Sequence, residues 1–81
     1  DDLRVLMPEV EIRTIRIADD SPYAGKMLKE TMIRSNYQVS IVAIRRGQQM
    51  TVSPGGEEVL CRGDLVMVLG SPDNIIRAFS A

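Results

Sequence analysis

The 81-residue sequence predicts a small α+β domain whose elements follow the order β-α-β-β-β-α, with two helices on a mixed or antiparallel sheet, and which packs as a dimer. Two Ser-Pro pairs, at residues 21–22 and 71–72, are typical helix starts. Apolar or β-branched runs separated by turn residues predict the strands. The run over residues 65–69 has no polar residue on either face, so both of its faces must be covered. In so short a chain, helices can cover one face, and we expect a second subunit to cover the other.

The first strand is expected over residues 10–17, which are rich in β-branched side chains. Its apolar phase slips along the strand. Val10 and Ile12 share one face, whereas Ile15 and Ile17 share the other. A bulge, a twist or contacts on both sides of the strand would each explain the slip.

The first helix is expected to begin at Ser21-Pro22 and to end at Arg34. Ser21 can accept the first free amide hydrogens, and Pro22 suits the first helical position. Its apolar side is expected to comprise Ala24, Leu28, Thr31 and Met32, with Lys26, Lys29 and Glu30 mostly outward. Gly25 costs about 1 kcal/mol relative to alanine in a helix interior, so we expect it to make a close contact with a neighbouring strand.

The second half of the chain alternates strands with turns. Residues 35–38 link the first helix to a strand over residues 39–44, and a hairpin-like turn at residues 45–48 leads to a short strand over residues 49–52. Further turns are expected at residues 53–56 and at Gly63-Asp64, on either side of residues 57–60. After the strand over residues 65–69, the last helix begins at Ser71-Pro72 and has an apolar stripe of Ile75, Ile76 and Phe79.

Residues 1–8 are expected to be a linker or a helix remnant, and residues 9–81 to form one domain. The chain begins with Asp1 and shows no basic, apolar signal region, which suggests a piece of a larger protein. No apolar run approaches the roughly 20 residues that a membrane helix needs. Ten basic and eleven acidic side chains give a net charge of -1, so we do not expect nucleic acid as a partner.

The composition leaves few routes to catalysis or metal binding. There is no histidine, and Cys61 is the only cysteine, which excludes Ser-His and Cys-His pairs, an intrachain disulfide and a Cys/His zinc site. We therefore expect no enzyme, a reducing compartment, and a packing or turn role for Cys61. The acidic pairs Asp19-Asp20 and Glu57-Glu58 could bind a hard cation, but adjacent acids beside turns are more often solvated. The turn Pro54-Gly55-Gly56 lacks the Gly-Lys-Ser/Thr ending of a phosphate-binding loop.

Arginines stand at the ends of two expected elements. Arg34 ends the first helix, and Arg45-Arg46 closes the strand over residues 39–44. Such arginines are commonly solvated surface charges. The alternative is anion recognition, because a guanidinium can hold a phosphate through two parallel hydrogen bonds and can stack on a purine. Arg34 is then the best single candidate for a nucleotide contact.

Several short motifs occur together in a set order. They are Glu11-Ile12, residues 21–28 (SPYAGKML), residues 41–47 (IVAIRRG), Pro54, Gly63-Asp64 and residues 68–70 (VLG). In order and spacing they resemble the TrkA C-terminal (RCK_C) domain family over nearly all of residues 9–81. The resemblance implies a cytosolic regulatory module of a potassium channel, a transporter or a cation antiporter in the inner or plasma membrane. It further implies a homodimer that binds a small ligand near its interface and contacts a membrane transport domain.

Some members of that family bind cyclic di-AMP through an Arg after the first helix, an Asn-Ile pair in the next strand and a proline beyond the hairpin. Arg34, Ile41 and Pro54 match this pattern. Ser40 stands in place of the Asn and cannot reproduce the donor and acceptor pair of an amide, and Met32 stands where relatives are often acidic. The resemblance thus implies a nucleotide site formed by Arg34, Ser40, Ile41 and Pro54. The alternative is a structural domain that dimerises a membrane transporter and binds no ligand.

Overall fold

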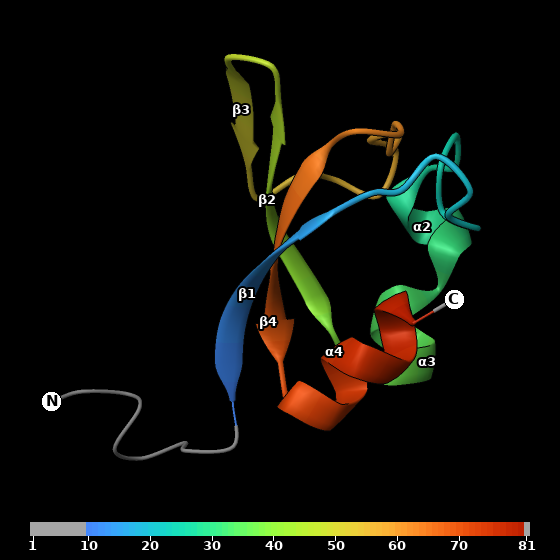
Figure 1. The fold of residues 1–81 in the computed structure, drawn as a ribbon, viewed down its shortest axis with the longest axis vertical. Helices are drawn as coiled ribbons and strands as arrows, with labels where there is room; N and C mark the ends of the chain where they lie inside the picture. The colour runs from blue at the N-terminus through green and yellow to red at the C-terminus, as the bar shows by residue number, and fades with distance from the viewer. Residues whose placement is uncertain (1–9, 81) are drawn as a thin grey trace, which may run out of the picture.

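The computed structural model describes residues 10–80, so the linker expected at residues 1–8 lies outside the described residues. Four strands form a single antiparallel sheet in the order β1-β4-β2-β3, and the helices lie together on one side of it (Figure 1). In chain order the elements are β1 (Glu11–Arg16), α2 (Leu28–Thr31), α3 (Ile33–Tyr37), β2 (Ser40–Arg46), β3 (Gln49–Val52), β4 (Leu65–Gly70) and α4 (Pro72–Phe79). The α+β class and the four strands are confirmed, and the sheet is wholly antiparallel.

The prediction that a helix begins at Ser21-Pro22 is wrong, because the first helix, α2, begins at Leu28. Residues 22–25 form turns, in which the Ser21 hydroxyl oxygen accepts a hydrogen bond from the Tyr23 amide at 3.1 Å. Gly25 has a φ of +84°, in the left-handed region where a regular helix cannot continue. A Cβ at this position would have no neighbour within 4 Å, so crowding does not require a glycine here, although the Gly25 amide donates to the Leu60 carbonyl at 2.7 Å. The backbone conformation, and not close packing, explains this glycine.

The helical residues that remain are divided into two short helices at Met32. This residue adopts a φ of +55°, and it is 49% exposed instead of lying on an apolar side. Arg34 therefore stands in the first turn of a new helix, α3, and does not end the first one. The link expected at residues 35–38 shrinks accordingly, because α3 runs on to Tyr37.

The phase slip in β1 does not come from a bulge in that strand. β1 pairs with β4 without a break in register, from Glu11 opposite Gly70 to Arg16 opposite Leu65. Ile12 is 63% exposed, on the face of the sheet away from Ile15. The one register shift between β2 and β4 lies between Ile41 and Ala43. The apolar residues of β1 are thus divided between the two faces of the sheet.

The core lies between the helices and one face of the sheet. Val66 and Val68 of β4 and Ile44 of β2 point to this side and pack with residues from the helices and connecting segments. The buried apolar cluster comprises Ile17, Ile33, Val39, Ile44, Leu60, Val66, Val68, Ile75 and Ala78. Ser71 begins α4 as expected, since its hydroxyl oxygen accepts a hydrogen bond from the Asn74 amide at 3.1 Å.

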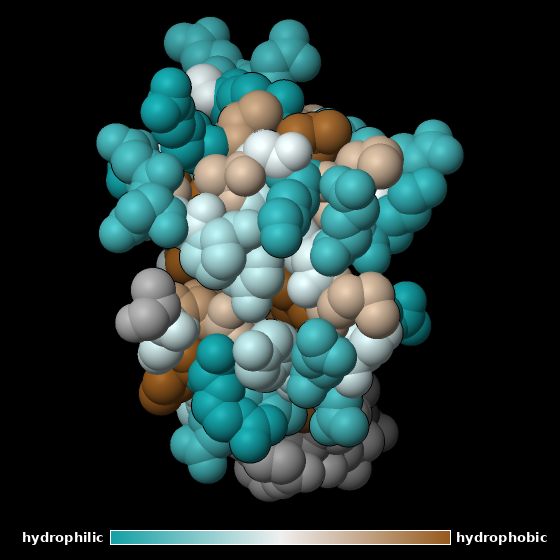
Figure 2. All heavy atoms as spheres, turned by 90° about the vertical axis from the view of Figure 1, so that its right-hand side faces the viewer, coloured by the Kyte–Doolittle hydropathy of each residue, from teal (hydrophilic) through white to brown (hydrophobic). Residues whose placement is uncertain are grey.

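The opposite side of the sheet, here called the open face, is not covered by any helix of residues 10–80. Residues directly opposite one another on neighbouring strands share a face. By this pairing the open face contains Ile12, Thr14, Arg16, Ser40, Ala43, Arg45, Met50, Val52, Leu65, Met67 and Leu69. Val52 is 70% exposed and Met50 50%. The helix-bearing side, by contrast, is mostly hydrophilic at its surface (Figure 2).

An ion pair between buried Asp64 and half-exposed Arg46 fastens the turn before β4 to the far end of β2. Asp64 is 1% exposed, and Arg46 donates to its two carboxylate oxygens through Nε and Nη2, each at 2.9 Å. The Cys61 amide donates to the same carboxylate at 2.9 Å, and Arg46 Nη2 donates to the Val59 carbonyl at 2.8 Å. Arg46 therefore has a structural role, with its Nε and Nη2 atoms engaged by Asp64 and Val59.

Candidate functional site

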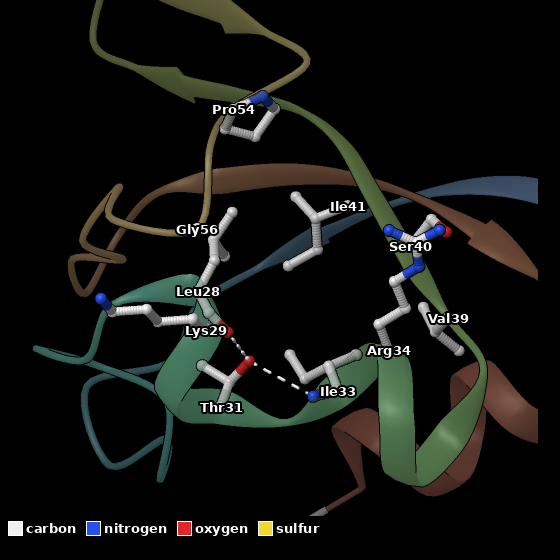
Figure 3. A pocket seen from close by; sticks show the side chains of 10 residues that line it. All are labelled: Leu28, Lys29, Thr31, Ile33, Arg34, Val39, Ser40, Ile41, Pro54 and Gly56. Atoms are coloured by element: carbon white, nitrogen blue, oxygen red, sulfur yellow. Dashed lines mark hydrogen bonds between the residues drawn. The ribbon is translucent and has the colours of Figure 1, made fainter.

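A cavity of about 290 Å³ lies between the two short helices, the start of β2 and the segment that follows β3 (Figure 3). Its lining residues are Leu28, Lys29, Thr31, Ile33, Arg34, Val39, Ser40, Ile41, Pro54 and Gly56. The structure thus brings together all four residues predicted as a ligand site, Arg34, Ser40, Ile41 and Pro54, from three separate segments. Arg34 extends from α3 toward Ser40 at the start of β2, and Pro54 lies on the opposite side of Ile41 (Figure 3).

The lining combines positive charge with apolar surface. Arg34 and Lys29 are its charged members, and no acidic side chain is among the lining residues. Among residues 10–80, no carboxylate lies within 4.0 Å of the Arg34 guanidinium. Most other lining side chains are apolar, such as Ile33, Ile41 and Pro54. A cavity of this character suits a ligand with an anionic group and a flat apolar part, as in a nucleotide.

Lys29 lines the cavity, and its side chain is 56% exposed, in agreement with its predicted outward position. Its amide donates to the Gly56 carbonyl at 2.9 Å, and a Cβ added to Gly56 would come within 3.3 Å of Lys29 Cβ. The Lys29 ammonium lies 3.9 Å from the Glu57 carboxylate. These contacts hold the wall formed by α2 against the segment after β3. No sequence signal identifies Lys29 as a lining residue, because its place in the cavity wall depends on the turn that replaces the first half of the expected helix.

Left-handed backbone conformations surround the cavity. The non-glycine residues with positive φ among residues 10–80 are Met32 (55°), Gln38 (58°) and Ser53 (54°). Each directly precedes a lining residue, namely Ile33, Val39 and Pro54. Each such conformation costs roughly 1 kcal/mol for an ordinary L-residue, and strain of this kind clusters at functional sites. Met32 and Gln38 are the C-cap residues of α2 and α3, where a left-handed conformation is common, so the helix ends shape this part of the cavity wall.

The remaining sequence candidates do not assemble into a site. Within residues 10–80, no three His, Cys, Asp or Glu residues lie close enough together to hold a metal ion. Cys61 is partly exposed and free, and its amide supports the Asp64 turn. In that described part of the chain, no helix has the length and apolar character to span a membrane.

Comparison with protein families gives a match to the TrkA-C domain over residues 12–81. The Ktr system potassium uptake protein C of Bacillus subtilis (strain 168) is 40% identical over 63 residues, which are 78% of this chain and 28% of that protein. The probable potassium channel protein 2 of Methanocaldococcus jannaschii is 33% identical over 67 residues, or 83% of this chain and 20% of that protein. The chain thus spans less than a third of the length of either relative.

Two similar structures contain a cyclic dinucleotide. The RCK C domain of the potassium transport protein KtrA, in complex with cyclic diadenosine monophosphate (c-di-AMP), has a TM-score of 0.79 and 28% identity, covering 94% of this chain and 87% of that one. The RCK_C domain dimer of Streptococcus agalactiae BusR, also with c-di-AMP, has a TM-score of 0.75 and 30% identity, covering 82% and 87%. The names of these two structures and of the two relatives mention no enzyme activity.

A longer BusR structure bears on the expectation about nucleic acid. BusR in complex with its busAB-promotor DNA matches with a TM-score of 0.76 and 30% identity, covering 86% of this chain but 34% of that one. A domain of this fold therefore occurs in a protein that binds DNA. The charge balance of a single domain does not reveal this, because the DNA-bound protein extends well beyond the matched part.

Proposed function

Because the chain belongs to the TrkA-C domain family, we propose that it is a ligand-sensing regulatory domain of a potassium or cation transport protein. On this proposal residues 9–81 form the regulatory unit, which works on the cytoplasmic side of a membrane next to the transport domain. Two copies dimerise, and a nucleotide-type ligand binds near their interface. The domain catalyses no reaction.

The observation that carries this proposal is the cavity lined by Arg34, Ser40, Ile41 and Pro54. The Arg34 guanidinium would hold a phosphate through charge-assisted hydrogen bonds, and Ser40 would donate one more. Ile41 and Pro54 would pack against the base. A volume of about 290 Å³ is just below the roughly 300 to 1,000 Å³ of small-molecule sites, so one copy offers room for part of a dinucleotide. A second copy would supply the rest.

The open face supports the dimer. It presents exposed apolar side chains, including Ile12, Met50 and Val52, and a hollow of about 200 Å³ lined entirely by open-face residues. Ser40 belongs to this face through its pairing with Leu69, and it also lines the cavity. A second copy packed on the open face would therefore lie at the edge of the ligand site. Ligand binding would then shift the balance between two arrangements of the dimer, which couples the site to transport.

We expect Met67→Glu to convert the dimer to a monomer at micromolar concentration, because two charged side chains would be buried in an apolar interface. Light scattering gives the mass directly. The matched control is Ile76→Glu, which places the same charge at a 52% exposed apolar residue on α4, away from the open face. A Met67→Glu protein that remains a dimer would show that the open face is not the interface.

The ligand proposal is tested by a thermal-shift panel of cyclic di-AMP, ATP, ADP, NAD, cyclic AMP and calcium. A ligand that binds only the folded state stabilises it by about 2.7 kcal/mol at 100 times its Kd, which raises the melting temperature of a small domain by several degrees. We expect a response to a nucleotide and none to calcium. An intact dimer that responds to no compound would instead favour the structural assembly domain, for which the serine at position 40 is the supporting feature.

A further inference from the structure

Thr31 lies at the junction of α2 and α3, in the wall of the cavity (Figure 3). It is buried, with 9% of its surface exposed. Its hydroxyl donates to the Leu28 carbonyl at 2.7 Å and accepts from the Ile33 amide at 3.3 Å. These two bonds lie on either side of Met32, the left-handed residue at which the helix breaks. One side chain therefore connects both helices across the break.

The two hydrogen bonds of Thr31 take the place of backbone hydrogen bonds that are lost where the helix breaks at Met32. Ile33 is the first residue of α3, so its N–H has no partner within that helix. Thr31 gives that N–H a buried acceptor, and its bond to Leu28 anchors the same oxygen to α2. The hydroxyl thereby fixes the direction in which α3 leaves the junction. Arg34 follows Ile33 directly, so this direction sets where the Arg34 side chain starts relative to the cavity.

The hydroxyl has no proton left for a ligand. A threonine carries a single O–H donor, and here it is directed at the Leu28 carbonyl. The charged contact to an anion in the cavity must come from elsewhere. Of the two cations that line it, Lys29 lies 3.9 Å from the Glu57 carboxylate, whereas Arg34 makes no ion pair with any described residue. The geometry thus separates the two roles: Arg34 carries the charge, and Thr31 holds the helix that carries Arg34.

We propose that Thr31 is a positioning residue for Arg34, whose hydroxyl sets the affinity for an anionic ligand by fixing α3 against α2. This inference rests on the proposed function, because its readout is ligand affinity. Thr31 is uncharged and its hydroxyl is bonded to the backbone, so on this proposal it acts on the ligand only through the position of Arg34.

The test compares Thr31→Val with Thr31→Ser in the 81-residue protein, using c-di-AMP as the probe and titration calorimetry as the measurement. Valine keeps the shape of threonine but removes both hydrogen bonds, and we expect affinity to fall about 10-fold, equivalent to about 1.4 kcal/mol. Serine keeps the hydroxyl, and we expect its affinity to stay within about threefold of the wild type. Thr31→Ala provides a second hydroxyl-free variant if valine disturbs folding.

The same pair of substitutions in an Arg34→Lys background separates positioning from general support of the fold. Lysine keeps the charge but lacks the two-pronged geometry that needs alignment. We therefore expect Thr31→Val to reduce affinity less in that background than in the wild type. An equal loss in both backgrounds, or no loss in the wild type, would overturn the inference. A wild-type domain that binds no nucleotide of the panel would overturn the proposed function, and this inference with it.

Discussion

Arg34→Ala is expected to lower the affinity for c-di-AMP by about 100-fold while leaving the dimer intact. Hydrogen bonds to charged groups contribute about 1.5 to 3 kcal/mol, and a loss of about 2.7 kcal/mol corresponds to 100-fold. Arg34 is exposed and makes no ion pair with any residue between 10 and 80, so its removal should leave the melting temperature nearly unchanged. Titration calorimetry measures the affinity, and light scattering measures the mass.

The matched control for Arg34→Ala is Arg62→Ala. Arg62 is also an exposed arginine, but it lies in the turn before β4 and does not line the cavity. Both substitutions change the net charge by the same amount, so a loss confined to Arg34→Ala would reflect a local contact. Equal affinities for the two variants would show that Arg34 does not contact the ligand.

Asp64→Ala is expected to lower the free energy of unfolding by about 3 kcal/mol. The Asp64 carboxylate accepts three hydrogen bonds, two of them from Arg46, and hydrogen bonds to charged groups contribute about 1.5 to 3 kcal/mol each. Arg46 is half exposed, so water can solvate its charge once Asp64 is gone, which keeps the expected loss at about 3 kcal/mol. The substitution also leaves the Cys61 amide without its acceptor. Urea unfolding at fixed protein concentration measures the change. Asp20→Ala, at an exposed turn residue, should shift the midpoint little.

The Asp64 carboxylate should also make the stability of the fold sensitive to acid. Burial by itself raises the pKa of Asp64, but the hydrogen bonds from Arg46 and from the Cys61 amide outweigh it and leave the pKa below its ordinary value. A lowered pKa in the folded state contributes stability that is fully present above the unfolded-state pKa of about 3.9 and is lost as the pH falls toward the folded-state value. Wild-type stability should therefore fall more steeply below about pH 4 than that of Asp64→Ala. Parallel slopes would contradict this account.

Local sequence signals were sufficient for the strands and for the last helix. Residues 49–52 follow the predicted bounds of β3, and Ser71 caps α4 as its Ser-Pro pair indicates. The prediction of the first helix was wrong because long-range pairing overrides local helix propensity around residues 25–29. The Gly25 amide donates to the Leu60 carbonyl at 2.7 Å, and the Leu28 amide donates to the Glu58 carbonyl at 2.9 Å. No local pattern shows that residues 25–29 pair with a segment some thirty residues further along the chain.

The candidate site was predictable to the extent that a family pattern named its residues. Arg34, Ser40, Ile41 and Pro54 lie far enough apart in sequence that only the fold brings them to one cavity. Lys29 is exposed and Thr31 is buried, as predicted, but the sequence did not identify either as a lining residue, because Pro54 and Gly56 reach the same cavity only through the fold. Their place in the cavity wall follows from the break at Met32, where neither glycine nor asparagine signals a left-handed conformation.

The left-handed residues Met32, Gln38 and Ser53 also bear on how this domain can evolve. Glycine or asparagine tolerates that conformation far better, so such replacements offer simple single-residue routes to greater heat resistance. All three residues directly precede lining residues of the cavity. Such a replacement would therefore alter the rim of the proposed ligand site, whereas stabilising changes elsewhere in the fold would leave that rim as it is.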